Sequence, residues 1–295
     1  MANTKDIRRR IKSIRNTAQI TKAMQMVAAS KMRRAQQAAL AGRSYASLMN
    51  RVLVSLEKRV PSRLHPLLEV REVKKELVLV ISTDKGLAGA INTNLLREVA
   101  RFEVEKTVYA TSGRKGVQFV ARTKRQLLAD FALKDTPKFH ETKPIAKFCM
   151  EKFLNREVDK VTAVYTYFVN TITQKPVVQT LLPISPFDLP QSTTASGTGA
   201  KAEEGSDPMT GYTFEPSSEE VLDTILPYYI HYQVYQMILD ARASEHSARM
   251  VAMKNATENA NQFIKDLSLE YNKMRQASIT TELLEIATAQ MALGG

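Results

Sequence analysis

The sequence predicts an α/β protein in which both chain ends form a long antiparallel two-helix coiled coil next to a central three-layer α/β (Rossmann-like) domain. Both ends carry an apolar seam that repeats about every 3.5 residues, the condition for a left-handed coiled coil. Between them, short apolar runs alternate with helical patterns, as in a sheet covered on both faces. The expected divisions are an N-terminal helix over 1–58, an α/β domain over 70–215 and a C-terminal helix over 217–295.

The N-terminal helix is predicted by steps of four and three residues from Ile7 to Leu56, because most positions in that series are apolar. The stretch 20–29 departs from this rule, since three of its apolar residues lie one position off the seam: Ile20, Met24 and Val27. A two-helix pair buries only one stripe, so a second apolar stripe needs another surface. That surface is either a third helix of the same chain or a different protein.

The C-terminal helix is predicted by the same steps from Leu222 to Met274. Ser217 or Ser218 is expected to cap it, and Pro227 to kink it or make it restart. No proline or glycine occurs over 228–293, so at about 1.5 Å per residue the helix should outrun its partner by some tens of Å. The apolar residues of this overhang need cover from another chain. They are Ile279, Leu283, Ile286, Met291 and Leu293.

The central segment alternates between strand and helix patterns. Strands are predicted over 76–82, 107–111, 161–170 and 177–184, and helices over 92–105, 114–122 and 143–156. Periodicity disappears over 190–211, which is expected to be a mobile insertion, followed by a short strand at 212–215.

The basic charge of the chain is concentrated at its N-terminal end. Residues 1–60 hold 14 Lys and Arg against Asp6 and Glu57, which accounts for the whole net charge of +12. Such an asymmetry suits a helix pair inside an acidic partner. A solvated basic face and a basic arm that grips nucleic acid are the alternatives. Base stacking is disfavoured because Tyr45 is the only aromatic residue of this helix.

The sequence shows no membrane span, no disulfide pair and no separate targeting segment. The sequence contains no run of about eighteen apolar residues, the length that is needed to span a bilayer. Cys149 is the only cysteine, which excludes an internal disulfide. The N-terminus is amphipathic and Arg-rich like a transit peptide, but its seam continues in phase from Ile7, so we expect it to belong to the mature helix.

No segment argues for catalysis by itself. Gly86 to Gly89 lies between a strand and a helix, where backbone amides could hold a phosphate. The spacing fits no phosphate-binding motif, so a structural turn is favoured. The four histidines lack metal-ligand spacing, and no serine has a placed base. An α/β nucleotide enzyme stays an alternative that requires nucleotide binding near Asp84 to Gly89.

Four blocks of the sequence resemble the gamma-subunit family of F-type ATP synthases. They are IKSIRNTAQITKAMQMVAASKMRRAQ (11–36), STDKGLAGAINTN (82–94), SEHSARMVAMKNATEN (244–259) and YNKMRQASITTELLEI (271–286). The chain departs from the family pattern at Ala289 and Gln290, where relatives have a Gly-Ala pair, and at Ala88, where they often have cysteine. The first departure favours helix, so the tip should be no less helical.

The resemblance implies a non-catalytic rotor subunit that couples c-ring rotation to ATP synthesis on beta subunits in a proton-translocating complex. It implies four partners, namely alpha and beta subunits around the coiled coil, and an epsilon (or delta-equivalent) subunit and the c-ring at the foot. It implies no cofactor, no metal and no nucleic acid. The expected location is peripheral, on the cytoplasmic face of a bacterial inner membrane, with an organelle inner or thylakoid membrane as the alternative.

The resemblance also carries contact residues to this chain. The residues implied to face the alpha/beta ring are Met24, Met26, Arg275, Gln276, Thr280, Glu282 and Ile286. The residues implied for the foot are Tyr212 and Glu215.

Overall fold

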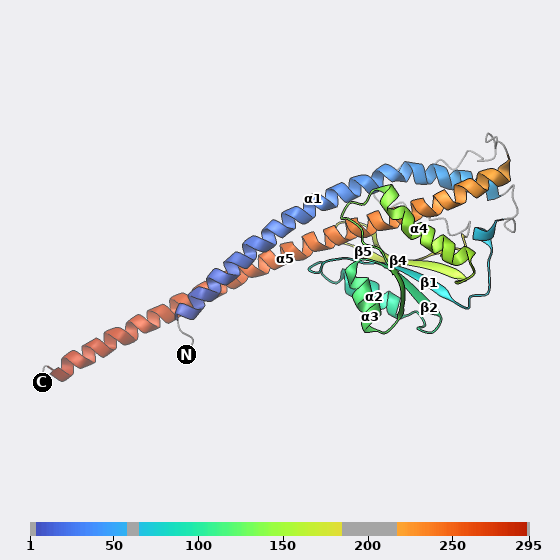
Figure 1. The fold of residues 1–295 in the computed structure, drawn as a ribbon. Coiled ribbons are helices and arrows are strands. Elements are labelled where there is room, and N and C mark those ends of the chain that lie inside the picture. The colour runs from blue at the N-terminus through green and yellow to red at the C-terminus, as the bar shows by residue number, and fades with distance from the viewer. Residues whose placement is uncertain (1–3, 58–64, 185–216, 294–295) are drawn as a thin grey trace. The chain divides into compact units, whose positions relative to one another are not determined.

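The structure, a computed structural model, describes residues 4–57, 65–184 and 217–293 (Figure 1). Its elements are α1 (Thr4–Glu57), the 3-10 helix η2 (Pro66–Leu68), β1 (Glu76–Ile81), α2 (Ile91–Ala100), β2 (Thr107–Ser112), α3 (Arg114–Arg122), β3 (Gln126–Asp130), α4 (Phe139–Leu154), β4 (Lys160–Phe168), β5 (Gln174–Leu182) and α5 (Ser218–Leu293). The chain divides into two compact units, one with residues 1–28 and 249–295 and one with residues 29–248. We call them the coiled-coil unit and the α/β unit, and α1 and α5 contribute to both.

The α/β unit is built on a sheet with the strand order β3-β2-β1-β4-β5. β1 pairs in parallel with both β2 and β4, so that Leu79 lies opposite Ala110 and Ala163. β3 continues the parallel part, and β5 returns antiparallel to β4. The order reverses between β1 and β4, which makes this a doubly wound sheet.

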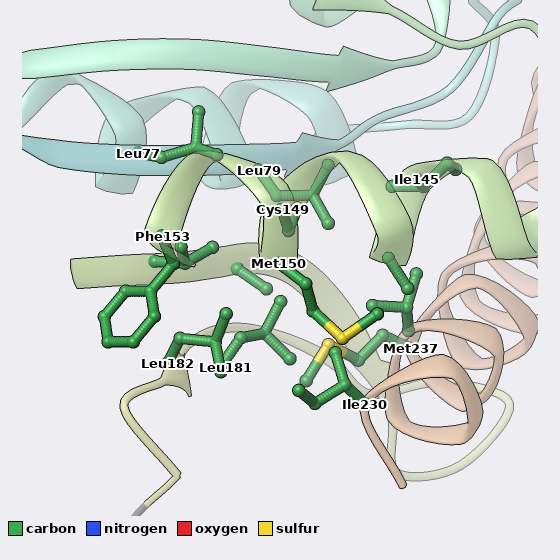
Figure 2. Packing of buried hydrophobic residues seen from close by; sticks show 14 of the residues in the cluster. Leu77, Leu79, Ile145, Cys149, Met150, Phe153, Leu181, Leu182, Ile230 and Met237 are labelled. Atoms are coloured by element: carbon green, nitrogen blue, oxygen red, sulfur yellow. The ribbon is translucent and has the colours of Figure 1, made fainter. Parts of the chain in front are cut away.

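Both faces of the sheet are covered by helices. Alternate β1 residues contribute to two separate clusters, because successive side chains of a strand point to opposite faces. Leu77 and Leu79 pack with α4 and α5, and Figure 2 shows members of this cluster from all three elements. Val78 and Val80 pack with residues of α2 and α3 on the other face. The three-layer α/β fold class predicted from the sequence is therefore confirmed.

Several elements differ from those the sequence predicts. β3 was not predicted, and α4 begins at Phe139 rather than at 143. This earlier start is stabilised by Glu141, whose Oε2 accepts from the Lys138 amide at 2.9 Å in front of the first turn. α5 runs through Pro227 without restarting. The expected insertion at 190–211 and strand at 212–215 lie outside the described residues.

The start of α5 follows the capping prediction. Ser217 precedes the helix, and its Oγ accepts from the amide of Glu220 at 3.2 Å. This bond satisfies one of the backbone donors that a helix start leaves without an intrahelical acceptor. No helix among the described residues has the length and hydropathy that a bilayer crossing requires.

The coiled-coil unit is an antiparallel pair of helices. Arg8 of α1 donates to the Tyr271 hydroxyl of α5 at 2.5 Å, and the hydroxyls of Thr21 and Thr257 are 2.7 Å apart. The α1 partners ascend in sequence while the α5 partners descend, so the helices run in opposite directions. The seam is buried on both helices, at Ile7, Ala18 and Ala28 of α1 and at Met253 and Ala260 of α5.

Candidate partner-binding surfaces

The end of α5 lies beyond its partner helix in the coiled-coil unit. Tyr271 and Met274 are its last half-buried seam residues, and Tyr271 already contacts Arg8 near the start of α1. From Arg275 to Met291 every side chain is exposed. The free length up to Leu293 is about 28 Å of helix. We call residues 275–293 the α5 tip.

Large apolar side chains are exposed on the α5 tip. Their exposed fractions are 48% for Ile279, 61% for Leu283, 61% for Leu284, 64% for Ile286 and 80% for Met291. Single exposed apolar residues are common on soluble proteins, but five of them within 13 residues of one helix indicate a contact surface. The prediction of an apolar overhang with no cover from its own α1 therefore agrees with the structure.

The ring-facing residues expected at this tip lie on two neighbouring helix faces. At about 100° per residue, Arg275, Glu282 and Ile286 fall within about 40° of one another. Gln276 and Thr280 share the adjacent face, where the Thr280 hydroxyl donates to the Gln276 carbonyl at 2.9 Å. Glu282 Oε1 also accepts from the Ser278 hydroxyl at 3.2 Å. All five side chains are nevertheless exposed, so they are placed to contact a surrounding surface.

The off-seam apolar residues of α1 form a second exposed surface, the α1 stripe of Ile20, Met24 and Val27. Ile20 is 61% and Val27 56% exposed, while Met24 is half-buried beside the seam. No described helix of the chain covers them, which favours a different protein as the partner. Met26 is 59% exposed but lies about 160° around the helix from Met24. The structure thus does not bring the two predicted methionines to one face.

Other exposed apolar residues of α5, among them Phe263, Leu269 and Leu284, were not predicted from the sequence. Phe263 is 60% and Leu269 71% exposed, and both lie in the coiled-coil unit. Phe263 and Leu269 are apolar and lie outside the seam, which is the same pattern that defines the α1 stripe. The sequence therefore held the signal for them. The structure also places the basic side chains that α1 contributes to this unit on its surface: Lys5, Arg8, Arg9, Arg10, Lys12, Arg15 and Lys22.

The carboxyl edge of the sheet is the place where doubly wound folds usually bind ligands, at the point where the strand order reverses. Here α5 occupies that edge. Arg242 of α5 contacts Asp84 after β1 at 3.1 Å, and Ser244 donates to the Thr166 carbonyl of β4 at 3.0 Å. The cavity that remains is about 10 Å³, room for about one water molecule.

The turn after β1 also serves the fold. Leu87 and Gly89 adopt positive φ angles of 60° and 59°, and Ala88 between them is 2% exposed. The Asp84 carboxylate accepts from the amide of Arg114 at the start of α3, so that amide is already bonded. Within the described ranges, no three His, Cys, Asp or Glu side chains lie together as metal ligands. Tyr212 and Glu215, expected at the foot, lie outside the described residues.

A coiled coil with exposed apolar side chains and a sheet whose ligand edge is filled are together typical of a subunit of an assembly. A model of the ATP synthase family matches residues 3–293, and the chain belongs to this family. Within it, the relatives are gamma chains. The chain is 52% identical to the ATP synthase gamma chain of Methylacidiphilum infernorum over 100% of both proteins. It is 49% identical to that of Opitutus terrae over 99% of each.

Solved structures agree with this assignment. The central stalk and c-ring structure of the Tetrahymena thermophila mitochondrial ATP synthase contains a chain that is 29% identical, with a TM-score of 0.61 over 80% of this chain and 99% of that one. A rotor chain of the Euglena gracilis enzyme is 20% identical, with a TM-score of 0.66 over 94% and 98%, and shows the shared fold. The resemblance read from the sequence is confirmed. A nucleic-acid-binding arm gains no support from these matches.

Proposed function

We propose that this chain is the rotating central shaft of an F1 sector, which couples proton-driven rotation of a c-ring to ATP synthesis on beta subunits. The shaft supplies torque and contributes no catalytic residue. Its relatives are named ATP synthase gamma chains, and one similar chain belongs to a central stalk solved with its c-ring. This chain would transmit torque through three sets of residues, which lie in the α5 tip, in the first helix and at the foot.

The α5 tip is the observation that carries the proposal. A helix end of about 28 Å with Ile279, Leu283 and Ile286 exposed would be an aggregation site if it stayed in water. A ring of alternating alpha and beta subunits would cover it on all sides, which fits side chains that are exposed all around the helix. Arg275, Gln276, Thr280 and Glu282 would then be the polar contacts of the tip with that ring.

The α1 stripe would be a second contact with the ring. Met24 and Met26 lie on different faces, so we propose that they touch different subunits or the same subunit at different angles of rotation. Methionine suits a contact that changes during rotation, because its side chain is unbranched and polarizable. The exposed basic residues of α1 would favour an acidic lining and speed the association.

Tyr212 and Glu215 are proposed for the foot, where the c-ring and an epsilon (or delta-equivalent) subunit would bind. Cysteine cross-linking can test this without replacing the native thiol. Cys149 is fully buried, and burial raises its pKa to about 12, so it stays a thiol at neutral pH. Tyr212→Cys should form cross-links to epsilon or c in the assembled complex. Free labelling of this thiol in the complex would contradict the placement.

We place the assembled chain at the periphery of a membrane, on the cytoplasmic face of a bacterial inner membrane. The bacterial relatives support this, since both named above come from bacteria. In inverted membrane vesicles, added protease should then cleave the exposed chain without detergent. Protection in inverted vesicles and cleavage in right-side-out ones would place it on the other face.

Reconstitution tests the rotor function itself. The chain is mixed with alpha and beta subunits from the same source, and the products are separated by size. We expect a complex that contains all three and hydrolyses ATP, whereas alpha and beta alone remain less active. A variant truncated after Met274 is the matched control, because it lacks only the α5 tip and should bind more weakly. If the full chain elutes separately and restores no activity, the proposal is wrong.

A further inference from the structure

A short stretch of α5, from residue 240 to residue 247, buries an unusual number of polar side chains. Six of them are at most 6% exposed: Asp240, Arg242, Ser244, Glu245, His246 and Ser247. Burying polar groups costs free energy unless each finds a partner. A helix that only had to cover the sheet edge would be better served by apolar residues.

Arg242 connects α5 to two loops of the α/β unit. Its guanidinium donates to Asp84 after β1 at 3.1 Å, to Glu245 one turn along α5 at 2.9 Å, and to the Leu133 carbonyl after β3 at 3.4 Å. Burial alone would lower the pKa of Arg242, but Glu245 and Asp84 outweigh it and hold the pKa above its usual value. Arg242 therefore remains charged and bonded on the side of β1 and β3.

Two serines connect α5 to β4 and to the turn between β4 and β5, beyond β1 in the strand order. Ser244 Oγ donates to the Thr166 carbonyl of β4 at 3.0 Å, and Ser247 Oγ to the Thr171 carbonyl, in the turn between β4 and β5, at 2.7 Å. Around the helix, these serines lie roughly 140–160° from Arg242. α5 is thus bonded on two nearly opposite sides, and we call Arg242, Ser244, Glu245 and Ser247 the α5 anchor.

This arrangement resists rotation of the helix about its own axis. Turning α5 in either sense would pull Arg242 from its loops or the serines from β4, since hydrogen bonds weaken steeply with distance and angle. Apolar contacts are non-directional and would permit such a turn at lower cost. A buried ion pair adds little net stability compared with apolar residues of similar volume, so its benefit here lies in orientation.

We propose that the α5 anchor, with Arg242 as its main positioning residue, fixes the rotational setting of α5 on the sheet, so that twist applied to one is passed to the other. The proposal rests on the rotor function proposed above, because a rotor loads its shaft in torsion. The anchored residues belong to the same helix that continues without a break to Leu293.

The test replaces the charged pair by apolar residues in the assembled complex. Arg242→Met combined with Glu245→Met removes both buried charges, while Asp84, whose side chain is 31% exposed, can still reach water. We expect the melting temperature and ATP hydrolysis to be retained and ATP-driven proton pumping per ATP to be lost in part. A purely stabilising pair would instead lower the melting temperature and leave that ratio unchanged.

A second measurement follows the setting of α5 directly in the isolated chain. Spin labels on Thr224→Cys in α5 and Arg122→Cys in α3 report the distance between helix and sheet layer. The double variant should broaden the distance distribution. As a matched control, Thr21→Val with Thr257→Val removes a hydrogen bond between α1 and α5 and should leave the distribution unchanged.

The outcomes separate the proposal from the rotor function. If the unmodified chain fails to assemble or pump, the rotor function is wrong. If it pumps and the double variant keeps both its pumping ratio and its distance distribution, the α5 anchor is wrong. Should the double variant fail to fold, Ser244→Ala with Ser247→Ala removes the β4 side alone. An unchanged distribution in that variant would equally overturn the proposal.

Discussion

Gly113 shows how a single residue sets the close approach of two segments. It precedes α3 with a φ of 110°, and a Cβ there would lie 2.2 Å from the Ser82 carbonyl oxygen. The clash is with backbone and cannot be relieved by a side-chain movement. We expect Gly113→Ala to lower the free energy of unfolding by about 3 kcal/mol, measured by urea denaturation of the isolated chain. Gly86→Ala, with no atom within 4 Å of its Cβ, should change it by no more than about 0.5 kcal/mol. Equal losses would contradict the steric explanation.

The environment of Asp135 predicts that the free energy of unfolding depends on pH. It forms an ion pair with Lys31 of α1, and this bond, opposed by partial burial, holds the pKa of Asp135 below its usual value. A lowered carboxyl pKa contributes stability above the unfolded-state value, and this contribution is lost as the pH falls through the folded value. Both side chains are partly exposed, at 39% and 48%, so the pair contributes at most about 1 kcal/mol.

The free energy of unfolding of the unmodified chain is compared with that of Asp135→Asn, which keeps the shape of the side chain and removes its charge. Above a pH of about 4 the unmodified chain should be the more stable, and the difference should disappear on further acidification. Added salt should reduce it at neutral pH as well, since the pair is near the surface. A difference that is independent of both pH and salt would show that the ion pair is not its cause.

At the scale of the helices, Gly42 occupies a seam position of α1 where glycine costs about 1 kcal/mol relative to alanine. The hydroxyl of Tyr232 on α5 donates to the Gly42 carbonyl, and a Cβ at Gly42 would lie 2.4 Å from that hydroxyl oxygen. Gly42→Ala should therefore destabilise the chain. In a Tyr232→Phe background the nearest remaining atoms are Gln236 Oε1 at 3.3 Å and a ring carbon at 3.4 Å, which small side-chain movements can accommodate. The same substitution should then be neutral or stabilising by up to about 1 kcal/mol. Thermal denaturation of the unmodified chain, the two single variants and the double variant measures this change of sign. The same loss of stability from Gly42→Ala in both backgrounds would contradict it.

The elements that could be predicted from the sequence are those whose signal is local. The seams of α1 and α5 and the apolar run of β1 follow from spacing alone, because each buries a fixed side of a regular structure. β3 has no such signal, since it is an edge strand with Leu127 and Leu128 more than one-third exposed. The bond between Arg242 and Asp84 joins residues 158 positions apart, and no periodicity reveals which loop a buried arginine will meet.

For the molecule as a whole, we propose that the surfaces left exposed by folding carry the function, and a substitution of Met24 tests this directly. Met24 is half-buried within the α1 stripe, next to Ile20, which is 61% exposed. Met24→Lys should leave the melting temperature of the isolated chain almost unchanged, because lysine is a good helix former and its long stem can carry the charge to water.

Inside a ring the same ammonium would have to be desolvated against an apolar lining. We therefore expect ATP hydrolysis by the Met24→Lys complex to persist while ATP-driven proton pumping falls. Met24→Leu is the matched control and should pump normally, since it keeps an apolar side chain of similar volume. Gln37→Lys adds the same charge at an exposed position of α1 in the α/β unit and controls for net charge. If Met24→Lys pumps as well as both controls, the α1 stripe is not a coupling contact, because a charge placed on it would then cost nothing.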